Sequence, residues 1–270
     1  MKTADFDFLA KMLNERSGLM LTSDKIYLLE SRLTPLARRI GLNSLDDLIR
    51  QLRTRGDEQL KRDVTDAMTT NESFFFRDQT PFKLFEDVVM PAMLQARGQR
   101  KKLRIWCAAG STGQEPYSLA MILKERQAKW SDWTFEILST DLASHVTDKA
   151  KAGRYSQFEV QRGLPIQLLM KYFDQEGDSW VLKPEIRRMV QFRQFNLLDG
   201  FSSLGTFDVV FCRNVLIYFD QPRKGQTLDK IRKVMPNDGY LFLGAAETVL
   251  GVTDKFKPVR GQRGLYMPTE

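Results

Sequence analysis

The chain has 270 residues, of which 42% are hydrophobic and 28% are charged, a balance that argues against long disordered stretches. Its formal net charge of +7 indicates an acidic partner, which could be a nucleic acid, an anionic membrane or an acidic protein surface. No stretch approaches the roughly 20 apolar residues of a membrane span, and the N-terminal MKTADFDFLA lacks the apolar run of a secretory signal. We therefore expect a cytoplasmic protein, and the length favours two domains.

Two cysteines and a single histidine limit the chemistry that the chain can carry. Cys107 and Cys212 lie in apolar, strand-like runs without metal-ligand spacing, so we interpret them as buried free thiols. A Ser-His-Asp triad, a Cys-His dyad or a histidine-rich metal site would each have to use His145. We expect neither imidazole-based catalysis nor a metal site.

Residues 1–68 carry helical patterns throughout. Apolar residues follow an i, i+4, i+7, i+11 spacing at Leu29, Leu33, Leu36 and Ile40. This stripe predicts a helix that packs on its neighbours and that either kinks or begins near Pro35. We expect residues 1–68 to form an all-α N-terminal domain.

A basic face is predicted beside this apolar stripe. Lys25, Arg32 and Arg39 recur every seven residues, and Arg38 adjoins them. These side chains form either a solvated charged surface or a docking surface for an acidic helix. The pattern alone leaves both interpretations open.

The segment TTNESFFFRD, residues 69–78, places three phenylalanines in a row. Neither a helix nor a strand can bury three consecutive side chains on one face, because helical neighbours diverge by about 100° and strand neighbours alternate. A buried turn followed by a solvated Arg77 explains the run without any function. The polar residues Asn71, Ser73 and Arg77 allow the alternative that the segment lines a site. We expect residues 69–90 to form a linker between the two domains.

Residues 91–270 alternate between strand and helix patterns. Strands are predicted at 103–109, 135–141, within 207–219 and at 240–247, and helices at 115–130, 144–153 and 229–235. This alternation indicates a parallel sheet covered by helices on both faces. Residues 255–259 and 264–268 lack an intervening helix and predict a closing hairpin at the sheet edge. A turn signal followed by apolar-polar alternation predicts a small antiparallel insert at about 172–195.

Polar residues gather where the predicted strands end. The turn GSTGQE at 110–115 would let the backbone approach a ligand closely, although it matches neither G-x-G-x-x-G nor a P-loop. Asp141 ends the second strand, where a carboxylate can accept hydrogen bonds from ribose hydroxyls. Glu115 opens the following helix, where the helix dipole also favours a carboxylate. Together these residues indicate an adenosine-containing ligand, either a dinucleotide or S-adenosylmethionine.

Three polar residues, Arg213, Asn214 and Tyr218, interrupt the apolar run CRNVLIYF at 212–219. A buried polar group that is left unpaired costs about 1–3 kcal/mol. These side chains therefore belong either to a structural hydrogen-bond network or to the ligand site.

Five segments resemble, in order and spacing, the motifs of the CheR-type chemotaxis receptor methyltransferases: TTNESFFFRD, CAAGSTGQEPYSLAM, STDL, FNLLD and FCRNVLIYFD. The resemblance covers essentially the whole chain. It implies a class I methyltransferase domain, with a Rossmann-like doubly wound sheet and a small antiparallel β insert, preceded by the all-α domain. It also implies transfer of a methyl group from S-adenosylmethionine to glutamate side chains on the cytoplasmic helices of chemoreceptors, which leaves S-adenosylhomocysteine.

The resemblance further implies roles for individual residues. Arg77 and Tyr218 match positions of the methyl-transfer centre, and the phenylalanines would anchor their segment in the core between the domains. Ser73 stands where the family commonly has threonine, and Asp78 where it often has glutamate, and both keep the functional group. The residues matched to cofactor positions are Asn71, Ser73, Arg77, Gly110, Glu115, Asp141, Asn196, Leu197, Arg213 and Asn214.

The implied partners are the acidic methylation helices of chemoreceptors, which Lys25, Arg32, Arg38 and Arg39 would attract. We expect a monomer that is recruited to membrane-bound receptor arrays but does not insert into the membrane. We expect it to need no metal and to bind no nucleic acid. A non-catalytic module that binds adenosylmethionine and docks on receptors is the main alternative. An NAD-linked oxidoreductase is disfavoured because G-x-G-x-x-G is missing, and nucleic-acid methylation because no base-reading motif is present.

Overall fold

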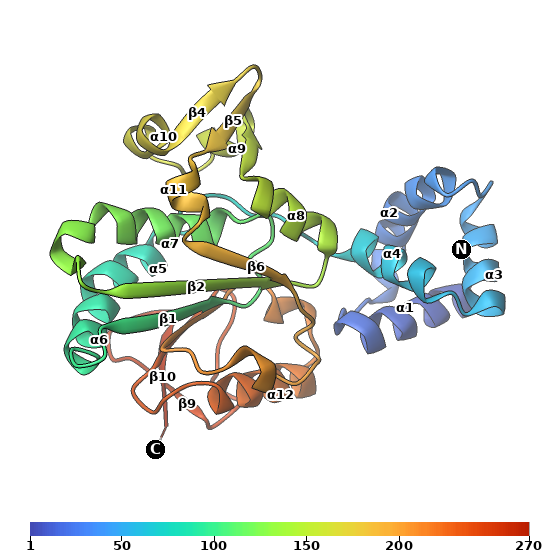
Figure 1. The fold of residues 1–270 in the computed structure, drawn as a ribbon. Coiled ribbons are helices and arrows are strands. Elements are labelled where there is room, and N and C mark those ends of the chain that lie inside the picture. Colours follow the sequence, from blue (N-terminus) through green and yellow to red (C-terminus); the bar gives the residue numbers. More distant parts are fainter. Residues whose placement is uncertain (270) are drawn as a thin grey trace. The chain divides into compact units, whose positions relative to one another are not determined.

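The structure is a computed structural model that describes residues 1–269. Of Arg55 it describes only the main chain. The chain divides into two compact units (Figure 1). The N-terminal unit comprises Met1–Thr70 and Tyr218–Arg223, and the larger unit comprises Asn71–Ile217 and the chain from Lys224 onward. Among the described residues, no helix is both long enough and apolar enough to cross a membrane.

The N-terminal unit is helical, as predicted, with α1 (Thr3–Ser17), α2 (Ile26–Arg39), α3 (Leu45–Arg55) and α4 (Glu58–Met68). The expected apolar stripe is buried at Leu29, Leu33 and Leu36. Ile40 does not belong to it, because α2 ends at Arg39 and Ile40 is 38% exposed. α2 runs through Pro35 and does not begin near it.

Polar and glycine residues set the ends of these helices. The side chain of Ser44 accepts the main-chain N–H of Asp47 at the start of α3, and the Asp57 carboxylate does the same for the first N–H groups of α4. Gly18 after α1 and Gly56 after α3 adopt left-handed conformations with φ of 77° and 59°, which glycine adopts without steric cost.

The larger unit contains a seven-stranded sheet in the order β6-β2-β1-β7-β8-β10-β9. Every neighbouring pair from β6 to β8 is parallel, whereas β10 runs antiparallel to β8 and β9. This topology confirms the predicted doubly wound sheet and its closing hairpin. The strands are β1 (Lys102–Cys107), β2 (Thr134–Asp141), β6 (Val190–Gln194), β7 (Val209–Cys212), β8 (Tyr240–Leu243), β9 (Phe256–Pro258) and β10 (Leu265–Pro268).

The small antiparallel sheet exists but differs in extent from the expected insert at 172–195. Its strands are β3 (Arg154–Ser156), β5 (Ser179–Leu182) and β4 (Phe173–Glu176), in that spatial order. Val190–Gln194 instead forms β6, which pairs in parallel with β2 in the main sheet. β6 is an edge strand with Val190 buried and its alternate residues exposed, so its sequence alternates like that of an antiparallel strand.

Helices flank both faces of the main sheet, with α7 on one side and α12 on the other (Figure 1). Residues 80–90, expected within the linker of 69–90, are helical and supply Phe82, Phe85 and Val89 to the core of the larger unit. The helices are α5 (Thr80–Leu84), a π-helical segment (Phe85–Val89), α6 (Met90–Ala96), α7 (Gln114–Glu125), α8 (Ser144–Ala152), α9 (Gln157–Gln161), α10 (Ile166–Tyr172), α11 (Pro184–Arg187) and α12 (Gln221–Lys233).

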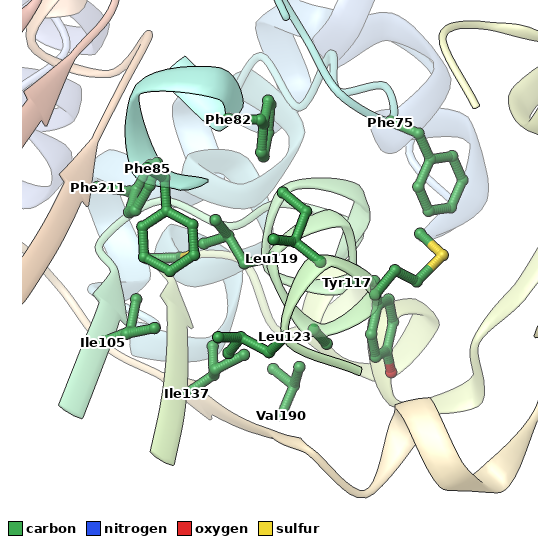
Figure 2. Close-up of a cluster of buried hydrophobic side chains, with 14 of the residues drawn as sticks. Phe75, Phe82, Phe85, Ile105, Tyr117, Leu119, Leu123, Ile137, Val190 and Phe211 are labelled. Atoms are coloured by element: carbon green, nitrogen blue, oxygen red, sulfur yellow. The ribbon is translucent and has the colours of Figure 1, made fainter. Parts of the chain in front are cut away.

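The core of the larger unit forms where α7 packs between the sheet and the segment around Phe75 (Figure 2). Every residue of α7 from Gln114 to Leu123 is buried. Of the three consecutive phenylalanines only Phe75 is fully buried, with its ring edge-on to Tyr155 at a centroid distance of 5.1 Å. The anchor is thus one side chain in the core of the larger unit, and Phe74 and Phe76 are only half-buried.

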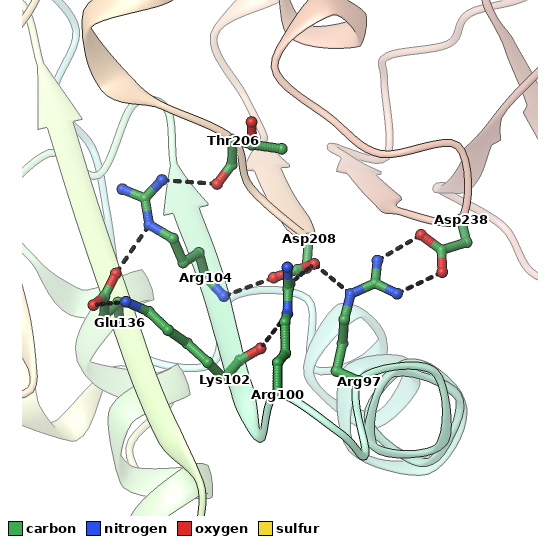
Figure 3. Close-up of polar contacts among 8 residues, drawn as sticks. All are labelled: Arg97, Arg100, Lys102, Arg104, Glu136, Thr206, Asp208 and Asp238. Carbon is green, nitrogen blue, oxygen red and sulfur yellow. Dashed lines mark hydrogen bonds and ion pairs between the residues drawn. The ribbon is translucent and has the colours of Figure 1, made fainter.

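A buried carboxylate organises the amino ends of the central strands (Figure 3). Asp208, just before β7, accepts Arg97 Nε at 2.8 Å and the main-chain N–H of Arg104 in β1 at 2.9 Å, and it also pairs with Arg100. Arg97 is bidentate to Asp238 as well. These contacts hold β1 beside β7 at the amino ends of the strands, whereas the candidate site lies at their carboxyl ends.

Candidate functional site

The predicted site residues follow the two strands that flank the switch point of the sheet. β1 pairs with β2 on one side and with β7 on the other, so the chain reverses its direction of winding at β1. Ligands of open α/β sheets bind in the crevice at the carboxyl ends of such strands. Gly110 and Glu115 follow β1, and Arg213 and Asn214 follow β7 directly.

The turn after β1 lies hard against β2 and needs glycine. The main-chain N–H of Gly110 donates to the Thr140 carbonyl at 2.9 Å. A Cβ atom on Gly110 would lie 1.9 Å from Ser139 Oγ, so any other residue would force the Ser139 side chain or the turn to move. Gly113, with φ of 97°, is the N-cap residue that precedes α7.

Asp141, at the end of β2, is a buried carboxylate bound by main-chain donors. Oδ2 accepts the N–H of Ser111 at 2.9 Å, and Oδ1 accepts the N–H of Ala143 at 3.2 Å. Burial raises the pKa of Asp141, although these N–H groups, the N–H of Leu142 and the nearby His145 oppose the increase. An ionised carboxylate offers about four acceptor positions, so Asp141 can still accept a hydrogen bond from a ligand.

Ser111 is a site residue that the sequence reasoning missed. Besides its contact with Asp141, its hydroxyl donates to the Asn71 carbonyl at 2.8 Å. It thereby joins the glycine turn to the segment that begins at Asn71, whose side-chain Nδ2 lies 3.5 Å from His145 Nε2. A polar residue between two glycines was the available signal.

The buried Arg213 is the centre of a charged cluster. Its Nη1 donates to Glu115 Oε2 at 2.6 Å, and its Nη2 donates to Asp78 Oδ2 at 2.7 Å and to the Arg77 carbonyl at 3.1 Å. Burial raises the pKa of Glu115, and the Arg213 and Arg77 charges act against that increase. The cluster therefore ties the start of α7, the end of β7 and the segment at 71–78 to one another.

One hydrogen-bond donor of this cluster has no partner among the residues that the structure describes. This donor is Arg213 Nε, which is buried. Buried N–H groups are almost always paired in folded proteins. An unpaired donor at the carboxyl edge of the sheet therefore fits a bound ligand that carries an oxygen acceptor.

Glu247 holds the loop after β7 and was also missed. Its carboxylate accepts the main-chain N–H groups of Gly244, Asn214, Val215, Leu216 and Ile217, at distances between 2.7 and 3.3 Å. This stabilises the left-handed conformation of Asn214, whose φ is 58°. The sequence placed Glu247 at the end of a predicted strand, where a charged residue after an apolar run was the only signal.

Asn196 and Leu197 lie in a turn directly after β6. Asn196 Oδ1 accepts the N–H of Leu198 at 3.0 Å, and Leu197 is buried. The ammonium group of Lys230 on α12 donates to the carbonyls of Leu197, Leu198 and Asp199 at 3.0, 2.7 and 3.0 Å. Lys230 thus fixes the shape of this turn.

The segment at 71–78 carries Arg77 in a strained main chain. Phe76, Asp78 and Gln79 have φ of 50°, 68° and 50°, a region that non-glycine residues rarely adopt and that is often found at functional sites. Arg77 Nη1 donates to the Glu72 carbonyl at 3.0 Å. Ser73, also expected in the site, is half-buried.

Tyr218 belongs to the N-terminal unit, although the sequence grouped it with the methyltransferase domain. Its carbonyl accepts the main-chain N–H of Met20 at 2.9 Å. The ring of the next residue, Phe219, lies so close to Gly18 that a Cβ atom there would be 2.8 Å from it. The α1–α2 connection therefore holds the main chain around Tyr218.

The four residues of the predicted basic face differ in their exposure and contacts. Lys25, Arg38 and Arg39 are exposed. Arg32 instead donates to the carbonyls of Met68 and Thr69 at 2.7 and 3.1 Å, where it caps the end of α4. Arg32 thus has a structural role that its spacing did not indicate.

Comparison with known proteins gives a match along nearly the whole chain. Residues 71–265 match the family model "CheR methyltransferase, SAM binding domain", and residues 4–69 match "CheR methyltransferase, all-alpha domain". The chain is 43% identical to Chemotaxis protein methyltransferase 1 of Pseudomonas aeruginosa, over 97% of this chain and 96% of that protein. It is 39% identical to Chemotaxis protein methyltransferase 1 of Vibrio cholerae, over 94% and 93% of the two chains.

Proposed function

Because the chain belongs to the CheR methyltransferase family, we propose that this S-adenosylmethionine-dependent enzyme methylates glutamate side chains of chemotaxis receptors. The products are glutamate methyl esters and S-adenosylhomocysteine, as chemotactic adaptation requires. The observation that carries the proposal is the ion-pair cluster at the switch point of the sheet, in which the buried Arg213 binds the buried Glu115 and the more exposed Asp78. Arg213 and Glu115 are two of the residues matched to the family's cofactor positions, and they lie at the edge where such sheets bind ligands, which supports the proposal.

The charges of the site suit S-adenosylmethionine, which supplies a methyl group on a positively charged sulfur. Glu115, Asp78 and the nearby Glu247 outnumber the guanidinium groups of Arg213 and Arg77. A local negative excess favours a cation. The unpaired Arg213 Nε would donate to a carboxylate oxygen of the cofactor, whose α-carboxylate is the available anionic group.

Other residues would hold the adenosine. Asp141 would accept hydrogen bonds from the ribose hydroxyls. The turn at Asn196 and Leu197 would lie next to the base. Gly110 lets the main chain approach the ligand closely. The full set proposed for cofactor binding is Asn71, Ser73, Arg77, Gly110, Glu115, Asp141, Asn196, Leu197, Arg213 and Asn214.

The substrate needs no general base. A glutamate carboxylate is ionised at neutral pH and can attack the methyl carbon directly, which explains how a chain with one histidine can catalyse the reaction. Arg77 and Tyr218 would align this carboxylate. Their contribution would be to orient the substrate. Binding that stabilised the substrate as strongly as the transition state would not raise kcat.

The N-terminal domain, residues 1–68, would dock on the receptor. Lys25, Arg38 and Arg39 are exposed and would attract acidic methylation helices, and Arg32 would extend their positive potential. On this proposal the enzyme works as a monomer in the cytoplasm and is recruited to membrane-bound receptor arrays. Residues 91–270 would carry the catalytic domain.

The test is transfer of radiolabelled methyl groups from S-adenosylmethionine to cytoplasmic fragments of chemoreceptors, scored as base-labile label. We expect label in the wild type and in Arg260→Ala, a control at an exposed arginine, and a sharp loss in Arg77→Ala and Tyr218→Phe. If calorimetry shows that the cofactor binds but no receptor glutamate is labelled, the result supports a non-catalytic, receptor-docking module instead.

A further inference from the structure

The turn after α9, next to the small antiparallel sheet, lies directly on the segment that carries Arg77. Gly163 in this turn has φ of 85°, and a Cβ atom on it would lie 2.1 Å from the Phe75 carbonyl oxygen. The turn itself is fixed by α9, which begins after β3 with a capping box between Ser156 and Glu159. The position of the neighbouring Arg162 is therefore set by the small sheet.

Arg162 and Arg77 share the same two partners. Arg162 Nη2 pairs with Glu72 Oε1 at 2.6 Å, and its guanidinium lies 4.3 Å from the centroid of the Phe74 ring. Arg77 donates to the Glu72 carbonyl at 3.0 Å, and its guanidinium lies 5.3 Å from the centroid of the same ring. Both arginines thus contact the Phe74 ring and Glu72, Arg162 through the Glu72 carboxylate and Arg77 through the Glu72 carbonyl.

We propose that Arg162 is a positioning residue for methyl transfer, which holds Glu72 and Phe74 as the support that aligns Arg77. The inference rests on the proposed role of Arg77. The carboxylate of Glu72 neutralises Arg162, and the ring face of Phe74 attracts both guanidinium groups, so the two cations can lie near each other. Without Arg162, the Glu72 side chain and the Phe74 ring each lose a partner, and Arg77 loses its fixed support.

The exposure of the ion pair indicates a role in geometry and not in folding. The side chains of Arg162 and Glu72 are 40% and 55% exposed. Exposed ion pairs contribute little to stability. Arg162 lowers the pKa of Glu72, as expected for two oppositely charged partners in contact.

The chain offers a matched control in Arg154. Its side chain pairs with Glu176 at 2.5 Å within the small sheet, and the two side chains are 49% and 56% exposed. This pair resembles Arg162–Glu72 in residue types and exposure but has no contact with residues 71–78 among the interactions described above. Arg162→Ala, Arg162→Lys and Arg154→Ala therefore separate the loss of this contact from the loss of any exposed arginine.

The first readout is hydrogen exchange of the full chain over residues 71–79, which needs no receptor. The N–H of Phe76 donates to Ser118 Oγ at 3.0 Å and reports on whether the segment stays in place. The second readout is kcat and KM for methyl transfer to receptor fragments. In Arg162→Ala we expect faster exchange and a kcat about 10-fold lower, with KM changed less than about twofold, because misalignment affects the chemical step. Arg162→Lys keeps the charge but not the planar stacking and should lie between, and Arg154→Ala should match the wild type.

A double mutant tests whether Arg162 acts through Arg77. In the Arg77→Ala background, Arg162→Ala should cause no further loss of kcat. The inference is overturned if Arg162→Ala leaves exchange unchanged, if it raises KM alone, or if Arg154→Ala has the same effects. If the wild type transfers no methyl group while Arg162→Ala still accelerates exchange, the proposed function fails but the support of the segment by Arg162 stands.

Discussion

Glu247 accepts the main-chain N–H of Asn214 at 2.8 Å, and the two residues come from the loops after β8 and β7. The same carboxylate accepts four further N–H groups, from Gly244 and from the three residues after Asn214. A single side chain therefore holds the loop that presents two proposed cofactor residues. Few side chains other than a carboxylate offer enough acceptor sites for this arrangement.

We expect Glu247→Gln to destabilise the protein and to impair catalysis together. The introduced amide would direct N–H groups at N–H donors, and hydrogen bonds to a charged acceptor contribute about 1.5–3 kcal/mol each. The free energy of unfolding should fall by about 3 kcal/mol, and kcat/KM should fall at temperatures where the variant is still folded. Urea denaturation and methyl-transfer kinetics measure the two effects.

The control is Glu136→Gln. Glu136 pairs with Lys102 and Arg104 at the amino end of the sheet, and its side chain is 40% exposed (Figure 3). Its loss should lower the free energy of unfolding by less than about 1 kcal/mol and leave kcat unchanged. Equal losses in the two variants would contradict the role assigned to Glu247.

The close contact between Gly18 and Phe219 predicts a coupling between a helix end and the proposed catalytic tyrosine. Gly18→Ala places a methyl group 2.8 Å from the Phe219 ring and forces alanine to adopt a φ of 77°. The left-handed conformation alone costs about 1–2 kcal/mol. We expect a larger loss of stability than this, and a lower kcat because the displaced ring adjoins Tyr218.

Gly56→Ala provides a matched comparison for this prediction. Gly56 also ends a helix of the N-terminal unit, with φ of 59°, but no atom lies within 4 Å of a Cβ placed there. This variant should show only the conformational cost, about 1 kcal/mol, and a normal kcat. The coupling is refuted if both variants lose the same stability and keep the same kcat.

Substitution of Lys230 should weaken cofactor binding, although Lys230 itself would not contact the cofactor. Lys230→Met would release the carbonyls of Leu197, Leu198 and Asp199, which the ammonium group holds together. We expect the affinity for S-adenosylhomocysteine, measured by calorimetry, to fall about 10-fold because the turn at Asn196 loses its shape. Lys233→Met, at an exposed position of the same helix, should bind normally, and a similar loss there would count against this mechanism.

The sequence predicted those parts of the site that follow directly from strand ends. Gly110, Asp141 and Arg213 come just after β1, at the end of β2 and just after β7, and apolar periodicity located these strands. The parallel topology then required their carboxyl ends to share one edge. This reasoning is local and needs no knowledge of distant contacts.

The residues that the sequence missed act on the main chain of distant segments. Apart from the contact between Glu247 and Gly244, these contacts of Ser111, Glu247 and Lys230 are with N–H or carbonyl groups that lie 30 to 40 residues away. Any main-chain group can serve as such a partner, so no side-chain pattern marks the contact. The misplacement of β6 has a different cause, since a half-exposed parallel edge strand has the same alternation as an antiparallel strand.

Asp141→Asn should change both the affinity for the cofactor and the pH dependence of stability. The ionised carboxylate would accept ribose hydroxyls, and a hydrogen bond to a charged group contributes about 1.5–3 kcal/mol, so Asp141→Asn should weaken cofactor binding by about 10- to 100-fold. Burial raises the pKa of Asp141 above its ordinary value of 3.8, so the folded state binds the proton more tightly than the unfolded chain. The stability due to this shift is present below pH 3.8 and is lost as the pH rises through the raised pKa.

The free energy of unfolding of the wild type, minus that of Asp141→Asn, should therefore fall as the pH rises from about 4 and become constant above the folded-state pKa. Asp132→Asn is the control, because a hydrogen bond from Lys101 lowers the pKa of the exposed Asp132 from 3.8. The corresponding difference for Asp132 should instead be lost as the pH falls through its lowered pKa. Urea denaturation between pH 3 and pH 7 measures both trends, and a difference for Asp141 that increased with pH would show that its main-chain donors outweigh its burial.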